Sequence, residues 1–344
     1  MAKSKYTSIG GQALLEGVMM RGKVHTAMAV RNASGDIEIE MYPTVRKERA
    51  AIFKKPFIRG VFALVDSLSI GYKCLMRSAD LSGMTEAEEA QKAEKRKKQS
   101  ALSRKLEVLL EKFMMPIATV LAVVLAVLLF MYLPVQLYTW LSQAIPSIQG
   151  NYLLRSVFEG VVRIVIFLAY VMATALMKDI RRTYQYHGAE HKTIFCFEKG
   201  LPLTVENVRV QKRFHPRCGT SFMVLMLLVG IVVSMFIRVD NPVLRTSLKI
   251  LTLPVLVSVG YELIQFAGRH DNPLTRLISA PGMAIQRITT REPDDTMIEC
   301  AIEAMRRVVP EAEGFPERET LPGSARAQAA ASEPAGAPEP AAAR

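Results

Sequence analysis

The stretch PIATVLAVVLAVLLFMYLPVQL, residues 116–137, carries no charged side chain from its first position to its last. A helix needs about 20 mainly apolar residues to cross roughly 30 Å of hydrocarbon, and this stretch meets that length. Three further apolar stretches follow at residues 156–177, 221–239 and 247–267. Four such runs in one chain predict a mainly α, polytopic membrane protein with about four transmembrane helices.

Charges between the apolar stretches orient the predicted helices. The segment between the second and third stretches contains nine lysines and arginines, whereas the segment between the first and second contains only Arg155. Because cytoplasmic loops carry an excess of Lys and Arg, we expect a protein of the cytoplasmic membrane with both termini in the cytosol. This bias and contact with membrane lipids, especially anionic headgroups, account for the net charge of +12 without specific DNA binding.

The regions outside the apolar stretches predict a small α+β portion in the cytosol or on the membrane surface. Residues 1–82 include alternating runs at 26–31 and 36–41, which predict a hairpin, and an amphipathic helix at 56–78. A charged helical linker is expected at 83–112, followed by a four-helix membrane region at 113–268 that includes a cytosolic His/Cys loop at 178–220. A C-terminal cytosolic region follows at 269–316, with a helix at 294–309, and the chain ends in a predicted disordered tail at 317–344.

The central loop contains the run YHGAEHK at residues 186–192. His187 and His191 are four positions apart, so on a helix they share one face and can bind one ion. Glu190 completes the order H-x-x-E-H of an inverted zincin motif, in which the glutamate is the general base. The run therefore predicts a site for Zn²⁺ or another divalent transition metal, with Glu190 as the catalytic residue. Gly188 has low helix propensity and argues against a regular helix here.

A second cluster, FHPRCGT at residues 214–220, follows in the same loop. His215 and Cys218 have the spacing of two metal ligands on a tight turn, and zinc binds imidazole and thiolate together readily. All four His and Cys side chains would make a closed, structural site, whereas three of them would leave one position open for catalysis. A structural role through hydrogen bonds alone also stays open for these side chains.

Four further polar residues are candidates for the same site. Glu16 and Arg21 lie in a glycine-rich run at residues 10–22, where they pair with each other or reach the site. Glu206 begins a short helical stretch, as a capping residue or as a partner of a metal ligand. Glu262 lies near the cytosolic end of the last apolar stretch, either facing the site or simply at the membrane interface.

Three other residues receive a structural interpretation. Glu159 and Arg163 lie four positions apart in the second apolar stretch, and this spacing predicts that they pair with each other rather than form a polar pathway. Cys196 lies in the apolar run IFCF, residues 194–197, which is typical of a strand in a protein core. We therefore leave Cys196 out of the predicted ligand set.

Several longer motifs match one known pattern: GQALLEGVMMR at residues 11–21, YHGAEHK at 186–192, HPRCGTSF at 215–222, and Pro281-Gly282, Gln286 to Thr290 and Glu292-Pro293 near the C-terminus. By these motifs the chain resembles the YqhQ-like family, bacterial membrane proteins of unknown function, over about residues 8–308. That family is described as predicted metal-dependent enzymes, so the resemblance implies a membrane architecture and a metal site. The match to true inverted zincins ends at the short motif, because no downstream glutamate ligand follows in a matching context.

Two functions follow from these patterns, and a third stays open. The first is a membrane-embedded, metal-dependent enzyme, a hydrolase of a lipid-linked molecule or a membrane-protein segment, with His187, His191 and either His215 or Cys218 on the metal. The second is a non-catalytic accessory factor of membrane-protein biogenesis, whose basic surface contacts the ribosome or the translocon and whose His/Cys cluster is structural. The third is transport, which four helices with few intramembrane charges would support only in a homo-oligomer.

Overall fold

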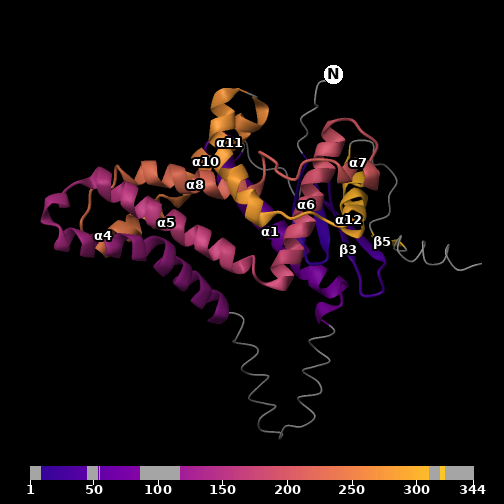
Figure 1. The fold of residues 1–344 in the computed structure, drawn as a ribbon, viewed down its shortest axis with the longest axis horizontal. Helices are drawn as coiled ribbons and strands as arrows, with labels where there is room; N and C mark the ends of the chain where they lie inside the picture. The colour runs from indigo at the N-terminus through magenta and orange to yellow at the C-terminus, as the bar shows by residue number, and fades with distance from the viewer. Residues whose placement is uncertain are drawn as a thin grey trace, which may run out of the picture.

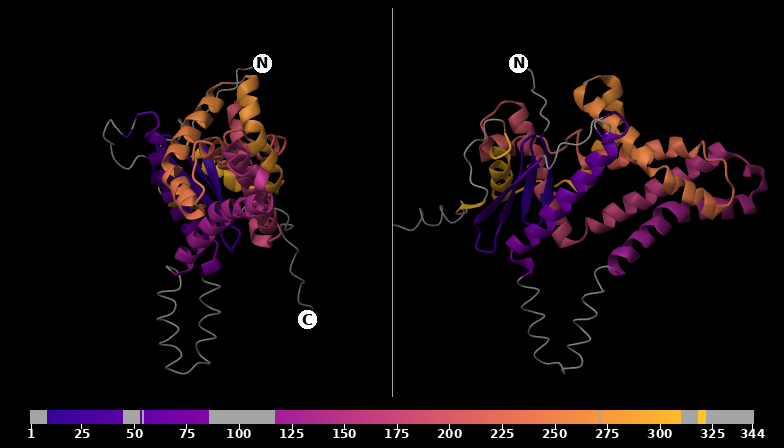
Figure 2. Two further views of the ribbon diagram at one scale, coloured as in Figure 1. Left: turned by 90° about the vertical axis from the view of Figure 1, so that its left-hand side faces the viewer. Right: turned by 180° about the vertical axis from the view of Figure 1, so that it is seen from behind.

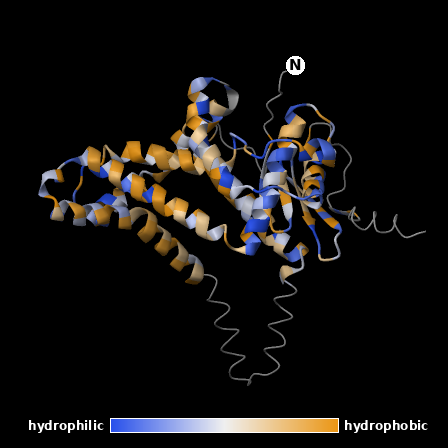
Figure 3. Cartoon of the chain, in the orientation of Figure 1, coloured by the Kyte–Doolittle hydropathy of each residue, from blue (hydrophilic) through white to orange (hydrophobic). Residues whose placement is uncertain are grey.

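The structure is a computed structural model that describes residues 9–44, 53, 55–85, 117–270, 272–309 and 318–321. These residues form a small α/β domain and an elongated helical arm, which lie at opposite ends of the molecule (Figure 1, Figure 2). Most of them are helical, which confirms the predicted mainly α class with a small α+β portion. The arm consists mostly of apolar residues, whereas polar and apolar residues are mixed in the domain (Figure 3).

The domain is built on an antiparallel sheet whose neighbouring strands follow one another along the chain. Its strands are β1 (Gly10–Leu14), β2 (Gly17–Arg21), β3 (His25–Arg31), β4 (Ile37–Pro43) and β5 (Arg318–Leu321). Strands β3 and β4 confirm the predicted hairpin. Gly35 in its turn has a φ of 88°, a conformation that glycine adopts without steric penalty.

Two parts of the sheet come from segments in which no strand was predicted. The glycine-rich run forms the hairpin β1–β2, where a Cβ on Gly17 would lie 2.3 Å from the Ala29 carbonyl oxygen. The stretch 317–344 was expected to be a disordered tail, which was wrong for residues 318–321, because these pair with β4 as strand β5. The rest of that stretch lies outside the described residues, as do residues 86–112 of the predicted linker.

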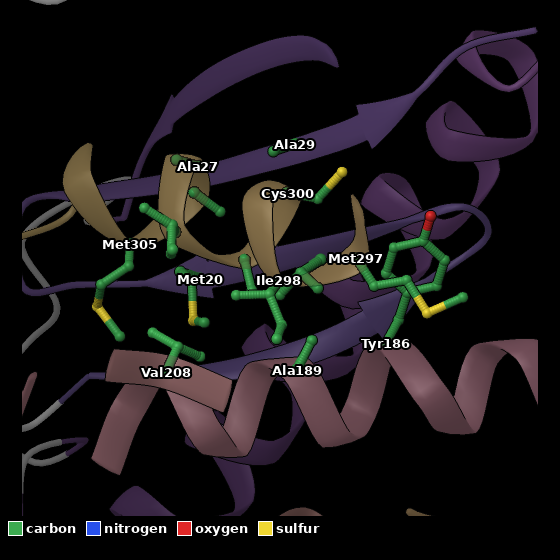
Figure 4. Packing of buried hydrophobic residues seen from close by; sticks show 14 of the residues in the cluster. Met20, Ala27, Ala29, Tyr186, Ala189, Val208, Met297, Ile298, Cys300 and Met305 are labelled. Carbon is green, nitrogen blue, oxygen red and sulfur yellow. The ribbon is translucent and has the colours of Figure 1, made fainter. Parts of the chain in front are cut away.

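Helices cover both faces of the sheet, because its strands alternate apolar side chains between the two sides. Val18 and Met20 face one core with two helices, and Met19 between them faces another core with a third helix. Figure 4 shows the first of these cores, with Met20 among its residues. The helices are α6 (Lys178–Glu198) and α12 (Asp295–Arg306) on the first face and α1 (Arg59–Leu81) on the second. The predicted central loop is therefore part of a folded domain that N-terminal, central and C-terminal segments build together.

The arm consists of two sets of helices, one before α6 and one after α7, and each set runs out from the domain and back (Figure 1). They are the π-helical turn η2 (Leu128–Tyr132), α4 (Leu133–Ala144), the 3₁₀ turn η3 (Pro146–Ile148), α5 (Tyr152–Thr174), α8 (Gly219–Ser234), α9 (Pro242–Leu251), α10 (Leu253–Arg269) and α11 (Pro273–Thr289).

Two helices of the described chain are long and apolar enough to cross a membrane, Ile117–Ala144 and Tyr152–Thr174. A third span exists if α9 and α10, which meet at an angle of 46°, count as one. Pro254 at the start of α10 has no amide hydrogen for the preceding turn, which favours a break at this point. Helix α8 is apolar but shorter than a span. The expected four transmembrane helices are therefore not confirmed, and two to three candidate spans are found.

The polar residues of α5 do not pair as predicted. Glu159 forms ion pairs with Arg155, Arg245 and Lys249 instead of Arg163. The Arg163 Nε donates instead to the Phe130 carbonyl oxygen at 2.8 Å. Spacing along α5 accounts for the i,i+4 pair of Arg155 and Glu159. It does not account for the contacts with α9 or with the Phe130 carbonyl of η2. The predicted pairing of Glu159 with Arg163 was therefore wrong.

Helix α6 is regular through Gly188, contrary to the expectation from helix propensity. A Cβ on Gly188 would lie 2.0 Å from the Arg291 carbonyl oxygen, so only glycine lets the chain after α11 pass this close to the helix. Cys196 also lies in α6, buried in the first core, and its predicted strand setting was wrong. Tertiary packing thus outweighs the helix-propensity cost of Gly188, which is about 1 kcal/mol relative to alanine.

The close approach at Gly188 makes a testable prediction. Replacing Gly188 with alanine should lower the free energy of unfolding by about 1–3 kcal/mol, because the added methyl group overlaps the Arg291 carbonyl and outweighs the gain in helix propensity. Gly230 is the matched control, since a Cβ there meets its nearest neighbour at an ordinary 3.7 Å. Thermal unfolding in detergent measures both variants, and a Gly188→Ala variant as stable as Gly230→Ala would contradict this interpretation.

Candidate metal centre

Three side chains from two segments meet at one point of the described structure. One ring nitrogen each of His187 and His191 and the sulfur of Cys218 all lie within 4.8 Å of one another. The two histidines stand one turn apart on α6, and their ring centroids are 4.4 Å apart. Cys218 is the N-cap residue of α8, so the point lies where the domain meets the arm.

Backbone carbonyls orient both imidazole rings. The His187 Nδ1 lies 2.8 Å from the Thr289 carbonyl oxygen, and the His191 Nδ1 lies 2.5 Å from the Arg213 carbonyl oxygen. A carbonyl oxygen only accepts, so each Nδ1 carries a proton, and in the neutral ring each Nε2 presents its lone pair. This is the arrangement of metal-binding histidines, whose second ring nitrogen donates to a carbonyl or a carboxylate.

The two Nε2 atoms have different surroundings. The His187 Nε2 lies 3.1 Å from the Cys218 sulfur. Only 1% of His191 is exposed, so its Nε2 cannot reach solvent. This buried atom has no hydrogen-bond partner in the described structure. A buried polar atom without a partner carries a desolvation penalty of about 1–3 kcal/mol. A bound cation at this point would remove that penalty.

The electrostatic surroundings favour the thiolate form of Cys218. Burial alone would raise the pKa of this thiol, but His187 and His191 hold it well below its ordinary value. Burial alone would likewise lower the pKa of His187, but the adjacent Cys218 raises it to about 9. The thiolate is the form of cysteine that binds metal ions.

Gln286 of α11 holds the turn that carries Cys218. Its side-chain oxygen accepts from the His215 amide at 2.7 Å, and its Nε2 donates to the His215 carbonyl at 2.7 Å and to the Ser221 hydroxyl at 3.0 Å. Gly282, one turn earlier, allows this contact, because a Cβ there would lie 2.5 Å from the Ser221 Cα. Gln286 was not among the predicted site residues. It appeared only as the first residue of a motif shared with the YqhQ-like family, Gln286 to Thr290.

Glu190 is buried beside the histidines, with 4% of its surface exposed. Its carboxylate accepts a hydrogen bond from the Gly11 amide of β1, and a Cβ on Gly11 would lie 2.8 Å from the Glu190 Cδ. Burial raises the pKa of Glu190, while the nearby His191 and His187 oppose that rise. The glycine-rich motif therefore lies against the candidate catalytic residue, which composition alone did not indicate.

His215 lies beside the three-residue group without belonging to it. Its ring centroid is 5.6 Å from that of His191 and 4.8 Å from that of Phe195. Its Nε2 lies 3.8 Å from a carboxylate oxygen of Glu198, which also forms an ion pair with Arg217. Burial lowers the pKa of His215. Glu198 was not among the predicted site residues.

The two candidates of the glycine-rich run lie outside the group. Glu16 forms an ion pair with Arg182 in α6, and its carboxylate accepts from the Tyr186 hydroxyl at 3.3 Å. Arg21 donates to the Ser67 hydroxyl at 3.0 Å, so it connects β2 to α1.

The last two candidates also lie elsewhere. Glu206 is exposed in the first turn of α7 (Val205–Arg209), where the Thr204 hydroxyl accepts from the Asn207 amide as the N-cap. Glu262 forms an ion pair with Arg59 of α1 at 2.6 Å, which joins the arm to the domain. The structure brings neither carboxylate into the three-residue group.

Comparison with known proteins places the chain in a family. The profile of the family described as "Protein of unknown function (DUF1385)" matches residues 55–311. The chain belongs to the DUF1385 family. It is also 33% identical over 312 residues to the uncharacterized protein YqhQ of Bacillus subtilis (strain 168), an alignment that covers 90% of this chain and 95% of YqhQ. The resemblance to the YqhQ-like family is thereby confirmed. No solved structure matches this DUF1385 chain.

The hydrogen bonds of Gln286 make a second prediction. Replacing Gln286 with leucine leaves the buried amide and carbonyl of His215 unpaired, which should lower the free energy of unfolding by about 1–3 kcal/mol for each group. Gln185→Leu is the control, because Gln185 makes one exposed contact of 3.3 Å and should change stability by less than about 0.5 kcal/mol. Chemical unfolding of both variants measures the difference, and equal stabilities would rule out this role.

Proposed function

We propose that this chain is a membrane-bound, metal-dependent hydrolase whose ion, Zn²⁺ or another divalent transition metal, is bound by His187, His191 and Cys218. The observation that carries the proposal is the His191 Nε2, which is buried and without a partner in the described structure, while the Nδ1 of the same ring donates to the Arg213 carbonyl oxygen. Imidazole with thiolate is a donor set that suits zinc.

The number of ligands supports a catalytic rather than a structural site. Three protein ligands with one open position are typical of catalytic zinc, whereas structural sites are closed by four. His215, the fourth residue of the predicted set, lies near Glu198 and outside the group. A non-catalytic cluster that only joins α6 to α8 is the rival interpretation, as an accessory factor of membrane-protein biogenesis would require.

A bound ion would supply a Lewis acid that polarises a carbonyl or phosphoryl oxygen of the substrate. Glu190 would accept the proton of the attacking water as general base. Burial raises the pKa of its carboxyl, which makes the carboxylate a stronger base. The Gly11 amide would fix one carboxylate oxygen of Glu190 and so orient the carboxylate. Cys218 would be held by the turn that Gln286 binds.

The position of the site supports a substrate associated with the membrane. Two of its parts come from helices of the arm, Cys218 from α8 and the Thr289 carbonyl from the end of α11. A lipid-linked molecule or a membrane-protein segment would reach this junction along the apolar arm. The proposal includes a cytosolic location of the domain in the cytoplasmic membrane, from the excess of basic residues around the site.

Metal content tests the proposal directly. Purified wild-type protein should contain about one zinc or other divalent transition-metal ion per chain, and His191→Ala should lose it, because two remaining ligands bind much more weakly. His270→Ala is the control, since His270 is exposed and lies outside the group. Elemental analysis by mass spectrometry measures the three proteins. Wild type without a transition metal, after purification without chelators, would refute the metal site.

Glu190→Gln separates catalysis from structure. This variant keeps the shape of the side chain and the three metal ligands but removes the base, so it should retain the metal and lose function in cells that depend on this protein. A Glu190→Gln variant that keeps both the metal and full cellular function would exclude the hydrolase and favour the accessory factor. Co-purification of wild type with ribosomes or a translocon would point the same way.

A further inference from the structure

A second group of charged side chains is buried in the arm, separate from the metal centre. We call this group the arm cluster. It lies where α5, α9 and the end of α8 meet, and at most 9% of any of its residues is exposed. It consists of Arg155, Glu159, Arg163, Arg245 and Lys249.

Carboxylates compensate only part of this charge. Glu159 accepts from the Nε of Arg155 and of Arg245, each at 3.0 Å, and forms an ion pair with Lys249. Asp240, at the exposed edge, accepts from Arg155 at 3.0 Å. The four cations of the arm cluster thus share two carboxylates, and two positive charges stay uncompensated among the residues that these contacts connect.

Arg163 is the cation with the least compensation. Its Nε donates to the Phe130 carbonyl oxygen. Pro134, four residues after Phe130, has no amide hydrogen and so cannot donate the helical hydrogen bond to this carbonyl. Its Nη2 is buried and has no partner in the described structure, and no ion pair of Arg163 is found there. Arg245 and Lys249 repel Arg163. Glu159 attracts it, but that carboxylate is already paired with three other cations. A charged side chain inside a membrane is expensive and normally has a partner.

A second polar group without a partner lies close by on α9. The Thr246 hydroxyl is buried and unpaired in the described residues. Thr246 precedes Lys249 by three positions, so both side chains leave α9 on one face. Helix α9 packs against η2, whose Phe130 carbonyl holds Arg163. The arm cluster and Thr246 therefore supply a guanidinium, an ammonium and a hydroxyl donor on helices that pack together.

We propose that the arm cluster binds a phosphate-type anion, with Arg163 as its principal ligand. A guanidinium remains charged in proteins and presents a planar fork that matches phosphate oxygens. Two uncompensated positive charges correspond to the one or two negative charges of such a group. The anion is either free phosphate or the headgroup of an anionic phospholipid. This site is independent of the proposed hydrolase, since its residues contact none of the metal ligands.

Thermal unfolding of the purified full-length chain in detergent tests the site. The probes are inorganic phosphate, added at constant ionic strength, and short-chain phosphatidylglycerol, compared with the same concentration of short-chain phosphatidylcholine. At least one anionic probe should raise the Tm of wild type in a saturable manner, because a ligand of the folded state stabilises it. Phosphate acting alone identifies a free anion, and phosphatidylglycerol acting alone identifies a lipid headgroup.

Variants locate the binding. Arg163→Gln should weaken the apparent Kd of the active probe at least about tenfold, while Arg238→Gln, which removes an equal charge from an exposed position, should leave it within about twofold. If Arg163→Gln does not yield folded protein, Arg163→Lys replaces it and should still bind several-fold more weakly, because the fork is lost. No saturable shift in wild type, or equal affinity in the Arg163 and Arg238 variants, would overturn the proposal.

Discussion

The candidate metal centre depends on two hydrogen bonds from imidazole Nδ1 atoms to backbone carbonyls. The Thr289 carbonyl is available because Thr289 ends α11, and the last carbonyls of a helix have no partner within it. The Arg213 carbonyl comes from the irregular segment before the Cys218 turn. Together they set the tautomer and the direction of His187 and His191, so the geometry of the centre depends on segments far from α6 in the sequence.

These contacts also join the domain to the arm. Helix α6 belongs to the core of the sheet, whereas α8 and α11 belong to the arm, and Gln286 connects the latter two through the Cys218 turn. Glycines allow the close packing between these segments. Gly188 of α6 lies against the Arg291 carbonyl, and Gly282 of α11 lies against Ser221 of α8. Any movement of the arm against the domain would therefore change the distance between the histidines and Cys218.

The predictable features are those in which neighbouring residues decide. Alternating apolar residues correctly indicated the hairpin β3–β4, and acidic residues before an apolar pattern correctly indicated α12. The glycine-rich run did not reveal β1 and β2, because its glycines serve contacts with other elements, such as that of Gly11 with Glu190. The expected four membrane spans were also not confirmed, since hydropathy does not show where a helix ends or bends.

The sequence by itself determined that this is a membrane-type helical protein and that His187, Glu190 and His191 have the spacing that would share one face of a helix. Both follow from local spacing and hydrophobicity, which act over a few turns of chain. Only the tertiary structure decided that α6 continues as a helix through Gly188, that Cys218 rather than His215 joins the two histidines, and that Arg163 forms no ion pair within the described residues. Such choices depend on how helices tens of residues apart pack together, and the spacing of residues along the chain carries no information about that packing.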